Sequence, residues 1–172
     1  MKYVIVIALV FIFSCKDATN KEEVAEVNPS IETEISLEIY DFDGLEKFLS
    51  TTDDKTYVVN FWAIWCAPCI KELPYFEKLN QEYTNDVEVI LVSLDFPSKY
   101  ETKLKPFIKN KNLKSKVVAL NDVDSNTWIP KVDESWTGAI PATIIFNKNE
   151  RKFYEKSFDY DELETEVKQF LK

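Results

Sequence analysis

The chain alternates between nearly continuous apolar runs and segments whose apolar residues recur at helical spacing. A continuous run predicts a strand buried on both faces, and the helical spacing predicts an amphipathic helix. The predicted strands cover residues 37–40, 56–62, 87–94, 116–120, 141–146 and 151–156. The predicted helices cover residues 41–50, 66–83, 99–110, 125–132 and 160–171. This alternation predicts an α/β fold with a parallel central sheet, to which the last two strands add an antiparallel hairpin.

The first residues carry a different pattern, in which Lys2 precedes an unbroken apolar run over residues 3–13. As a helix the run spans about 16 Å, which is short of the roughly 30 Å of a bilayer core. Residues 1–14 are therefore typical of an export signal rather than a membrane span. The run ends in Ile12-Phe13-Ser14-Cys15, which resembles a bacterial lipobox and implies that Cys15 carries a lipid. An ordinary cleaved signal that happens to contain a cysteine is the alternative.

Residues 15–36 are polar and charged and contain no aromatic side chain. We interpret them as a flexible tether that joins the membrane to a domain over residues 37–172. An additional strand within residues 31–35 is the alternative.

Composition narrows the possible partners and cofactors. The 172 residues are 45% hydrophobic, which is enough to fill the core of one domain. With only two glycines, the chain has no glycine-rich phosphate loop and no dinucleotide fingerprint, and no cofactor is expected. The net charge is −9 and Arg151 is the single arginine, which argues against a nucleic-acid partner.

The candidate chemistry lies directly after the predicted strand at residues 56–62, in the run Trp65-Cys66-Ala67-Pro68-Cys69. A thiol at the start of a helix is favoured as a thiolate, and a second thiol one turn later can close on it. This pair is the minimum apparatus for thiol–disulfide exchange. A structural disulfide is the alternative, but a ring of four residues stabilises a fold by only about 2 kcal/mol. A zinc site would need four ligands, whereas the chain has no His and only Cys15 as a further cysteine.

Three segments carry a resemblance to the thioredoxin superfamily. Residues 61–69 are similar to its active-site segment, and Pro74 matches its helix-kinking proline. The segment Ile140-Pro141-Ala142-Thr143 is similar to the superfamily's cis-proline segment. The resemblance implies a thioredoxin-like fold over about residues 37–172, with a central mixed sheet flanked by helices. The helix and strand at 99–120 resemble the insertion that the exported ResA/TlpA-like branch carries before the cis-proline segment.

Two polar residues strengthen the likeness to that branch. Asn60 stands where thioredoxin carries a buried Asp, and Glu72 stands where ResA-like proteins carry a Glu. The second thiol, Cys69, is expected to be buried and hard to deprotonate, so a nearby carboxylate would accept its proton. Because Asn60 cannot ionise, Glu72 is the candidate. The alternative for Glu72 is a solvated acid that complements the helix N-terminus.

The expected mechanism uses both cysteines in turn. A Cys66 thiolate attacks a client disulfide, and Cys69 resolves the mixed disulfide, which leaves a Cys66–Cys69 redox disulfide. A cis Pro141 would lie beside the pair, so that Ile140 offers backbone groups for strand-like docking of a client. A proline at the start of a strand is the alternative for Pro141. Trp65 is expected to shield the active-site surface, with a packing role equally compatible with the sequence.

The sequence therefore predicts an exported, membrane-anchored thiol–disulfide oxidoreductase of the cell envelope that reduces client proteins. A membrane electron-donor protein would reduce its disulfide again after each turnover. The resemblance implies that it acts on apocytochrome c thiols or in redox homeostasis. The absence of His favours a reductase over a disulfide-forming oxidase. Other hypotheses are a peroxiredoxin-like thiol peroxidase, which would need an activating arginine, a non-catalytic adhesion or scaffold lipoprotein, and a haem- or metal-binding module. The last is disfavoured because His is absent and Met1 is the single methionine.

Overall fold

The computed structural model describes residues 35–50 and 53–171. The predicted export signal, Cys15 and residues 15–34 of the predicted tether lie outside the described residues. Ile35 and Leu37 are partly buried and pack against the hydrophobic core. Packing of the described domain therefore begins at Ile35, near the end of the segment interpreted as a tether.

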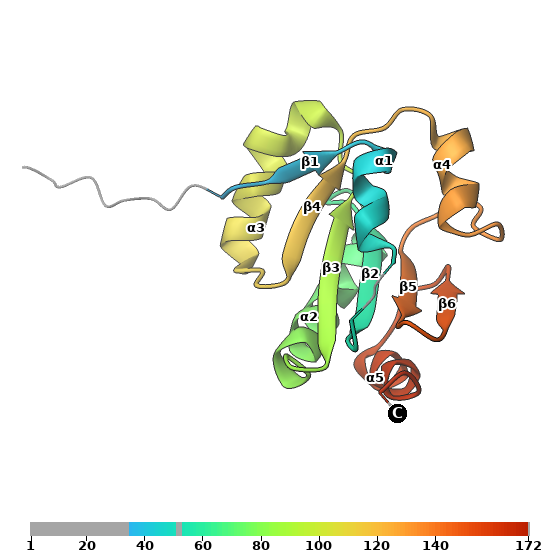
Figure 1. Cartoon of the computed structure of the whole chain (residues 1–172). Helices are drawn as coiled ribbons and strands as arrows, with labels where there is room; N and C mark the ends of the chain where they lie inside the picture. The colour runs from blue at the N-terminus through green and yellow to red at the C-terminus, as the bar shows by residue number, and fades with distance from the viewer. Residues whose placement is uncertain (1–34, 51–52, 172) are drawn as a thin grey trace, which may run out of the picture. The chain divides into compact units, whose positions relative to one another are not determined.

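The described part of the chain forms a six-stranded sheet with the order β1-β4-β3-β2-β5-β6 (Figure 1). The strands are β1 (Glu38–Tyr40), β2 (Thr56–Trp62), β3 (Val87–Ser93), β4 (Lys116–Leu120), β5 (Ala142–Phe146) and β6 (Arg151–Tyr154). The pairs β1–β4, β4–β3 and β3–β2 are parallel, whereas β2–β5 and β5–β6 are antiparallel. This confirms the predicted α/β fold with a central mixed sheet and a late antiparallel hairpin.

Helices cover both faces of the sheet (Figure 1). The α-helices are α1 (Phe42–Leu45), α2 (Ala67–Glu82), α3 (Lys105–Lys111), α4 (Ser125–Val132) and α5 (Tyr160–Lys168). Shorter helical turns are η1 (Glu46–Phe48), η2 (Pro97–Lys99) and the π-helical η3 (Tyr100–Leu104). Side chains of α2, α3 and α5 join one core cluster, and those of α1 and α4 join the other.

The central strand β2 contributes side chains to both core clusters, because its side chains alternate between the two faces of the sheet. Val58 and Trp62 belong to the cluster on the α2 side, and Val59 and Phe61 belong to the cluster on the α1 side. All four side chains are fully buried. The continuous apolar run in the sequence therefore corresponds to a strand with two buried faces.

The segment predicted as one helix over residues 99–110 consists instead of η2, η3 and α3 in succession. At the junction, the Lys105 N–H bonds to the carbonyl of Tyr100, five residues back. Pro106 has no N–H to continue an α-helical ladder, and its ring would crowd the carbonyl four residues before it. The wider π-turn accommodates this proline. The predicted helix over residues 41–50 likewise divides into α1 and η1.

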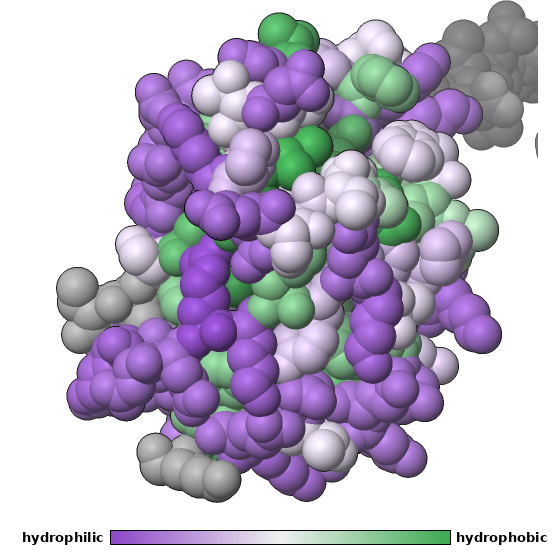
Figure 2. All heavy atoms as spheres, turned by 90° about the vertical axis from the view of Figure 1, so that its right-hand side faces the viewer, coloured by the Kyte–Doolittle hydropathy of each residue, from purple (hydrophilic) through white to green (hydrophobic). Residues whose placement is uncertain are grey.

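Polar side chains dominate the face of the molecule shown in Figure 2, with apolar side chains scattered between them. Within residues 35–50 and 53–171, no helix is both long enough and apolar enough to cross a bilayer. Large apolar side chains are nevertheless exposed at Trp65 and Phe96. These two residues follow the carboxyl ends of β2 and β3, where open α/β sheets place their functional sites.

Candidate active site

The two cysteines of the predicted redox pair lie at the junction of β2 and α2. Cys66 is the N-cap of α2 and is joined to Cys69 by a disulfide. The Cys69 N–H donates to Cys66 Sγ at 3.3 Å, so this sulfur occupies the place of a capping oxygen. After reduction, the same N–H group and the helix dipole would stabilise a Cys66 thiolate.

Burial distinguishes the two sulfur-bearing residues. Cys66 retains 5% of its surface, whereas Cys69 retains none. An incoming sulfur atom can therefore approach only Cys66, because accessibility decides which sulfur reacts in disulfide exchange. Trp65, which directly precedes Cys66, is 60% exposed and lies on the surface rather than in the core.

The sheet brings Ile140 and Pro141 beside Cys66. Because β5 runs antiparallel to β2, with Ala142 opposite Phe61, the start of β5 lies next to the end of β2. The Ile140–Pro141 peptide bond is cis. The carbonyl oxygen of Ile140 lies 3.7 Å from Cys66 Sγ. A backbone acceptor therefore faces the one sulfur that an outside reactant can approach.

Glu72 is a fully buried carboxylate one turn after Cys69 on α2. It accepts three hydrogen bonds, from Asn60 Nδ2 at 3.0 Å, from Ser157 Oγ at 2.9 Å and from Phe158 N at 2.8 Å. Burial raises the pKa of Glu72, and the three donors partly oppose that rise. The alternative of a solvated first-turn acid is wrong, because this side chain points into the core.

Asn60 connects Glu72 to the strand that follows Pro141. Its Nδ2 also donates to Thr143 Oγ1 at 3.0 Å, across the β2–β5 pair. Asn60 and Thr143 are both fully buried. Asn60 Oδ1 has no hydrogen-bond partner in the described part of the chain. The amide thus joins β2, α2 and β5 without bringing a second charge to the site.

Asp95 is a second buried carboxylate, which the sequence patterns above do not single out. It is 2% exposed and follows β3 by two residues. The Ile64 N–H donates to both of its oxygens, at 3.1 and 3.2 Å, and Ser93 Oγ donates to it at 2.9 Å. Asp95 therefore holds the turn before Cys66 against the end of β3. Its place just beyond a buried strand is the signal that could have found it.

We expect Asp95→Ala to lower the free energy of unfolding by about 1–3 kcal/mol, the cost of leaving buried donors without an acceptor. Urea unfolding followed by tryptophan fluorescence measures this loss. The exposed residue Glu134 provides the control, and Glu134→Ala is expected to shift the free energy by less than about 0.5 kcal/mol. Coincident unfolding curves for Asp95→Ala and the wild type would contradict the anchoring role.

Arg151, the residue that a thiol peroxidase would need beside its cysteine, is engaged elsewhere. Its guanidinium donates to the carbonyl oxygens of Leu49 at 2.8 Å and Val132 at 2.7 Å. These bonds fasten β6 to the segments around η1 and α4. The geometry therefore gives Arg151 a packing role and offers no support for an activating role at Cys66.

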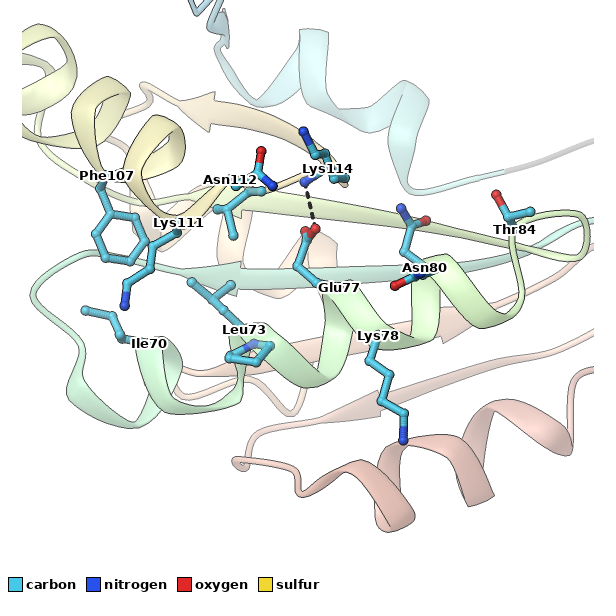
Figure 3. Close-up of a pocket in the computed structure, with 13 residues that line it drawn as sticks. Ile70, Leu73, Glu77, Lys78, Asn80, Thr84, Phe107, Lys111, Asn112 and Lys114 are labelled. Carbon is cyan, nitrogen blue, oxygen red and sulfur yellow. Dashed lines mark hydrogen bonds between the residues drawn. The ribbon is translucent and has the colours of Figure 1, made fainter.

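A groove of about 690 Å³ lies between α2 and α3 (Figure 3). Leu73 and Phe107 supply apolar lining, and Glu77 accepts the Lys114 N–H at 2.6 Å. Neither cysteine of the disulfide lines this groove. Among the described residues, no cluster of His, Cys, Asp and Glu side chains is arranged to hold a metal ion. The disulfide, Glu72 and Asp95 therefore all lie outside the lining of this groove.

Comparison with known proteins finds a matching family and relatives that are named as a thiol-disulfide oxidoreductase and a thioredoxin-like protein. Residues 28–151 match the AhpC/TSA family. Thiol-disulfide oxidoreductase ResA of Bacillus cereus is 30% identical over 112 residues, which cover 64% of this chain and 60% of ResA. Thioredoxin-like protein YneN of Bacillus subtilis is 36% identical over 64 residues, which cover 37% of this chain and 38% of YneN. The chain thus spans about two fifths to three fifths of the length of these relatives.

Solved structures share the fold. StoA from Bacillus subtilis matches with a TM-score of 0.51 and 24% identity, over 66% of this chain and 83% of StoA. A secreted thiol-disulfide isomerase from Corynebacterium glutamicum matches with a TM-score of 0.59 and 16% identity, over 74% of each chain. These likenesses confirm the predicted thioredoxin-like fold. Because the family match over residues 28–151 covers more than half of the chain, the protein belongs to the AhpC/TSA family of thioredoxin-like proteins.

Proposed function

We propose that the chain is a thiol–disulfide oxidoreductase that reduces client protein disulfides outside the cytoplasm. The position of Cys66 carries this proposal. Its sulfur caps a helix, is bonded to the buried Cys69 and lies 3.7 Å from the Ile140 carbonyl oxygen. A purely structural bridge requires neither the helix cap nor the adjacent backbone acceptor. The similarity to ResA, which is named as a thiol-disulfide oxidoreductase, supports thiol–disulfide exchange for this chain.

The reaction transfers two electrons to the client in two exchanges. The Cys66 thiolate attacks one sulfur of the client disulfide, that bond breaks, and the other client sulfur leaves as a thiolate. Cys69 then attacks the Cys66 sulfur of the mixed disulfide. The Cys66–Cys69 bond forms, the second client sulfur leaves, and the client is reduced while the protein is oxidised.

The second exchange requires Cys69 to lose its proton in a fully buried position. Residues three apart on a helix lie on one face, so Glu72 is placed on the same side of α2 as Cys69. We assign the ionised Glu72 carboxylate as the acceptor of the Cys69 proton. Burial raises the pKa of Glu72 and so brings it closer to the pKa of a thiol, which favours proton transfer between the two groups.

The client is proposed to dock beside Cys66 as an extended segment along the backbone of Ile140 and Pro141. Main-chain hydrogen bonds of this kind provide affinity without requiring one client sequence. The exposed Trp65 adds apolar contact area next to the reacting sulfur. This arrangement suits a protein that acts on disulfides in several polypeptides.

Location and partners are further parts of the proposal. The leader at residues 1–14 and the lipobox ending at Cys15 favour export and anchoring by a lipid. The similar isomerase from Corynebacterium glutamicum is a secreted protein, which supports a place outside the cytoplasm. A membrane electron-donor protein would reduce the Cys66–Cys69 disulfide after each turnover. Cytochrome c maturation is the proposed process, in which apocytochrome c thiols would be kept reduced.

The potential of the Cys66–Cys69 couple tests the direction of exchange. We expect a value nearer to about −270 mV than to about −120 mV, because no His lies between the cysteines to stabilise the thiolate. Equilibration of the protein in glutathione and dithiothreitol buffers, followed by thiol trapping, measures it. A value near about −120 mV would favour a disulfide-forming oxidase. Rapid consumption of hydrogen peroxide by the reduced protein would instead favour a thiol peroxidase.

A further inference from the structure

A proton received by Glu72 has no direct way out of the protein. The carboxylate is fully buried, so water does not reach it. Once the Cys66–Cys69 bond has formed, Cys69 cannot take the proton back until the disulfide is reduced again. While the protein is oxidised, the proton can therefore reach the solvent only through a group that contacts Glu72.

The three hydrogen-bond partners of Glu72 differ in what they can do with a proton. The Asn60 amide nitrogen and the Phe158 backbone nitrogen are donors only. The Ser157 hydroxyl donates to Glu72 Oε2 at 2.9 Å and can also accept a hydrogen bond after rotation about its C–O bond. Ser157 is thus the one partner that can both take a proton from Glu72 and give one away.

Exposure separates the same partners. Ser157 lies in the exposed connection between β6 and α5, whereas Phe158 is 3% exposed. The Asn60 contact leads inward, to Thr143, and both of those residues are fully buried. Of the three contacts, the Ser157 contact is therefore the one that reaches the surface.

We infer that the Ser157 hydroxyl carries protons between Glu72 and the solvent; the inference rests on the proposed role of Glu72 as the proton acceptor for Cys69. When the Cys66–Cys69 bond forms, the Cys69 proton passes to the Glu72 carboxylate. The carboxylic acid then gives its proton to the Ser157 oxygen, while the hydrogen that this oxygen carried passes to a water molecule. Ser157 ends as a neutral hydroxyl and Glu72 as a carboxylate, so protons and charges balance.

A matched pair of variants isolates the hydroxyl. Ser157→Thr keeps the hydroxyl. Ser157→Val has a side chain of the same shape as threonine but carries a methyl group where the hydroxyl stood, and this methyl group prevents a water molecule from taking the position of the hydroxyl. The fully reduced protein is mixed with dithiodipyridine in a stopped-flow instrument under single-turnover conditions. Attack by Cys66 releases one thiopyridone, and attack by Cys69 on the mixed disulfide releases the second. The two phases of absorbance therefore report the two cysteines separately.

We expect Ser157→Val to delay the release of the Cys69 proton to the solvent, followed with a pH-indicator dye, about tenfold behind the second phase of absorbance, and to leave both phases of absorbance unchanged. Ser157→Thr should retain the wild-type rate of proton release. Ser135→Val makes the same change at an exposed serine that donates to Asp133, and it should alter neither the two phases nor the release of the proton. Equal rates of proton release in the Thr and Val variants would overturn the inference, and so would a Val variant whose second absorbance phase slows as much as its proton release. A wild-type protein that releases no thiopyridone would instead overturn the proposed function.

Discussion

Cys66→Ser is expected to abolish reduction of client disulfides, with a loss of more than about 1,000-fold, because removing a nucleophile can cost about 10⁶-fold in rate. Cys69→Ser is expected to stop the reaction halfway, since the buried thiol that releases the client is gone. The client then stays bound to Cys66 through a disulfide. Non-reducing electrophoresis of the variants after incubation with a disulfide-containing protein shows these covalent complexes, and mass spectrometry identifies the partner cysteine.

The third cysteine of the chain provides the control for this experiment. Cys15→Ser removes a thiol outside the proposed redox pair, and it should retain the wild-type rate with a purified client. Activity in Cys66→Ser, or failure of Cys69→Ser to accumulate any mixed disulfide, would contradict the two-step mechanism. The second outcome would also weaken the assignment of the chain as an enzyme.

Glu72→Gln is expected to slow the attack of Cys69 about 100-fold, within the range for loss of a general base. Glutamine can still accept hydrogen bonds from Ser157 and Phe158, so the variant removes the charge while these two contacts remain. The Asn60 amide must turn its oxygen toward the new NH2 group. In the wild type the rate should rise with pH as Glu72 ionises, and the variant should lack this rise. Stopped-flow measurement of the second thiopyridone at a series of pH values tests both statements. The exposed Glu134 supplies the control Glu134→Gln, and a rise with pH that persists in Glu72→Gln would contradict the role.

The same titration makes folding stability depend on pH. Burial raises the pKa of Glu72 above its ordinary value of 4.5, so the folded state binds this proton more tightly than the unfolded chain. The stabilising contribution is therefore complete below pH 4.5 and is lost as the pH rises through the raised pKa. The free energy of unfolding of the wild type should fall relative to that of Glu72→Gln in this window. A difference between the two that stays constant from acidic to neutral pH would contradict the shift.

The parts of the fold that the sequence predicts best are those whose pattern reflects burial on a regular element. β2, β4 and α4 have the predicted bounds. Each of these segments shows a nearly continuous apolar run or apolar residues at helical spacing, so neighbouring residues report the same environment. The segment around Pro106 breaks this condition, because one residue without an N–H changes the hydrogen bonding of a whole turn.

The residues of the candidate site also differ in whether the sequence predicts them. Cys66, Cys69 and Glu72 follow from spacing within one helix and from a resemblance that covers the segment. Asp95 and Ser157 do not follow, because their hydrogen bonds join residues 31 and 85 positions apart. Spacing along a single sequence holds no information about such pairs. Both become visible once the sheet order places the ends of β2 and β3 side by side and α2 against the segment before α5.

The pairing of β2 with β5 fixes the distance between Cys66 and Ile140, whatever the length of the chain that connects them. The loop before α4, at residues 121–124, lies outside this pairing. Loops of this kind tolerate insertion and exchange far better than the elements they join. The sheet therefore keeps the proposed docking backbone at Ile140 beside the disulfide, whichever sequence the loop before α4 carries. Loops transplanted from relatives could change which clients are selected while the chemistry at Cys66 is left intact.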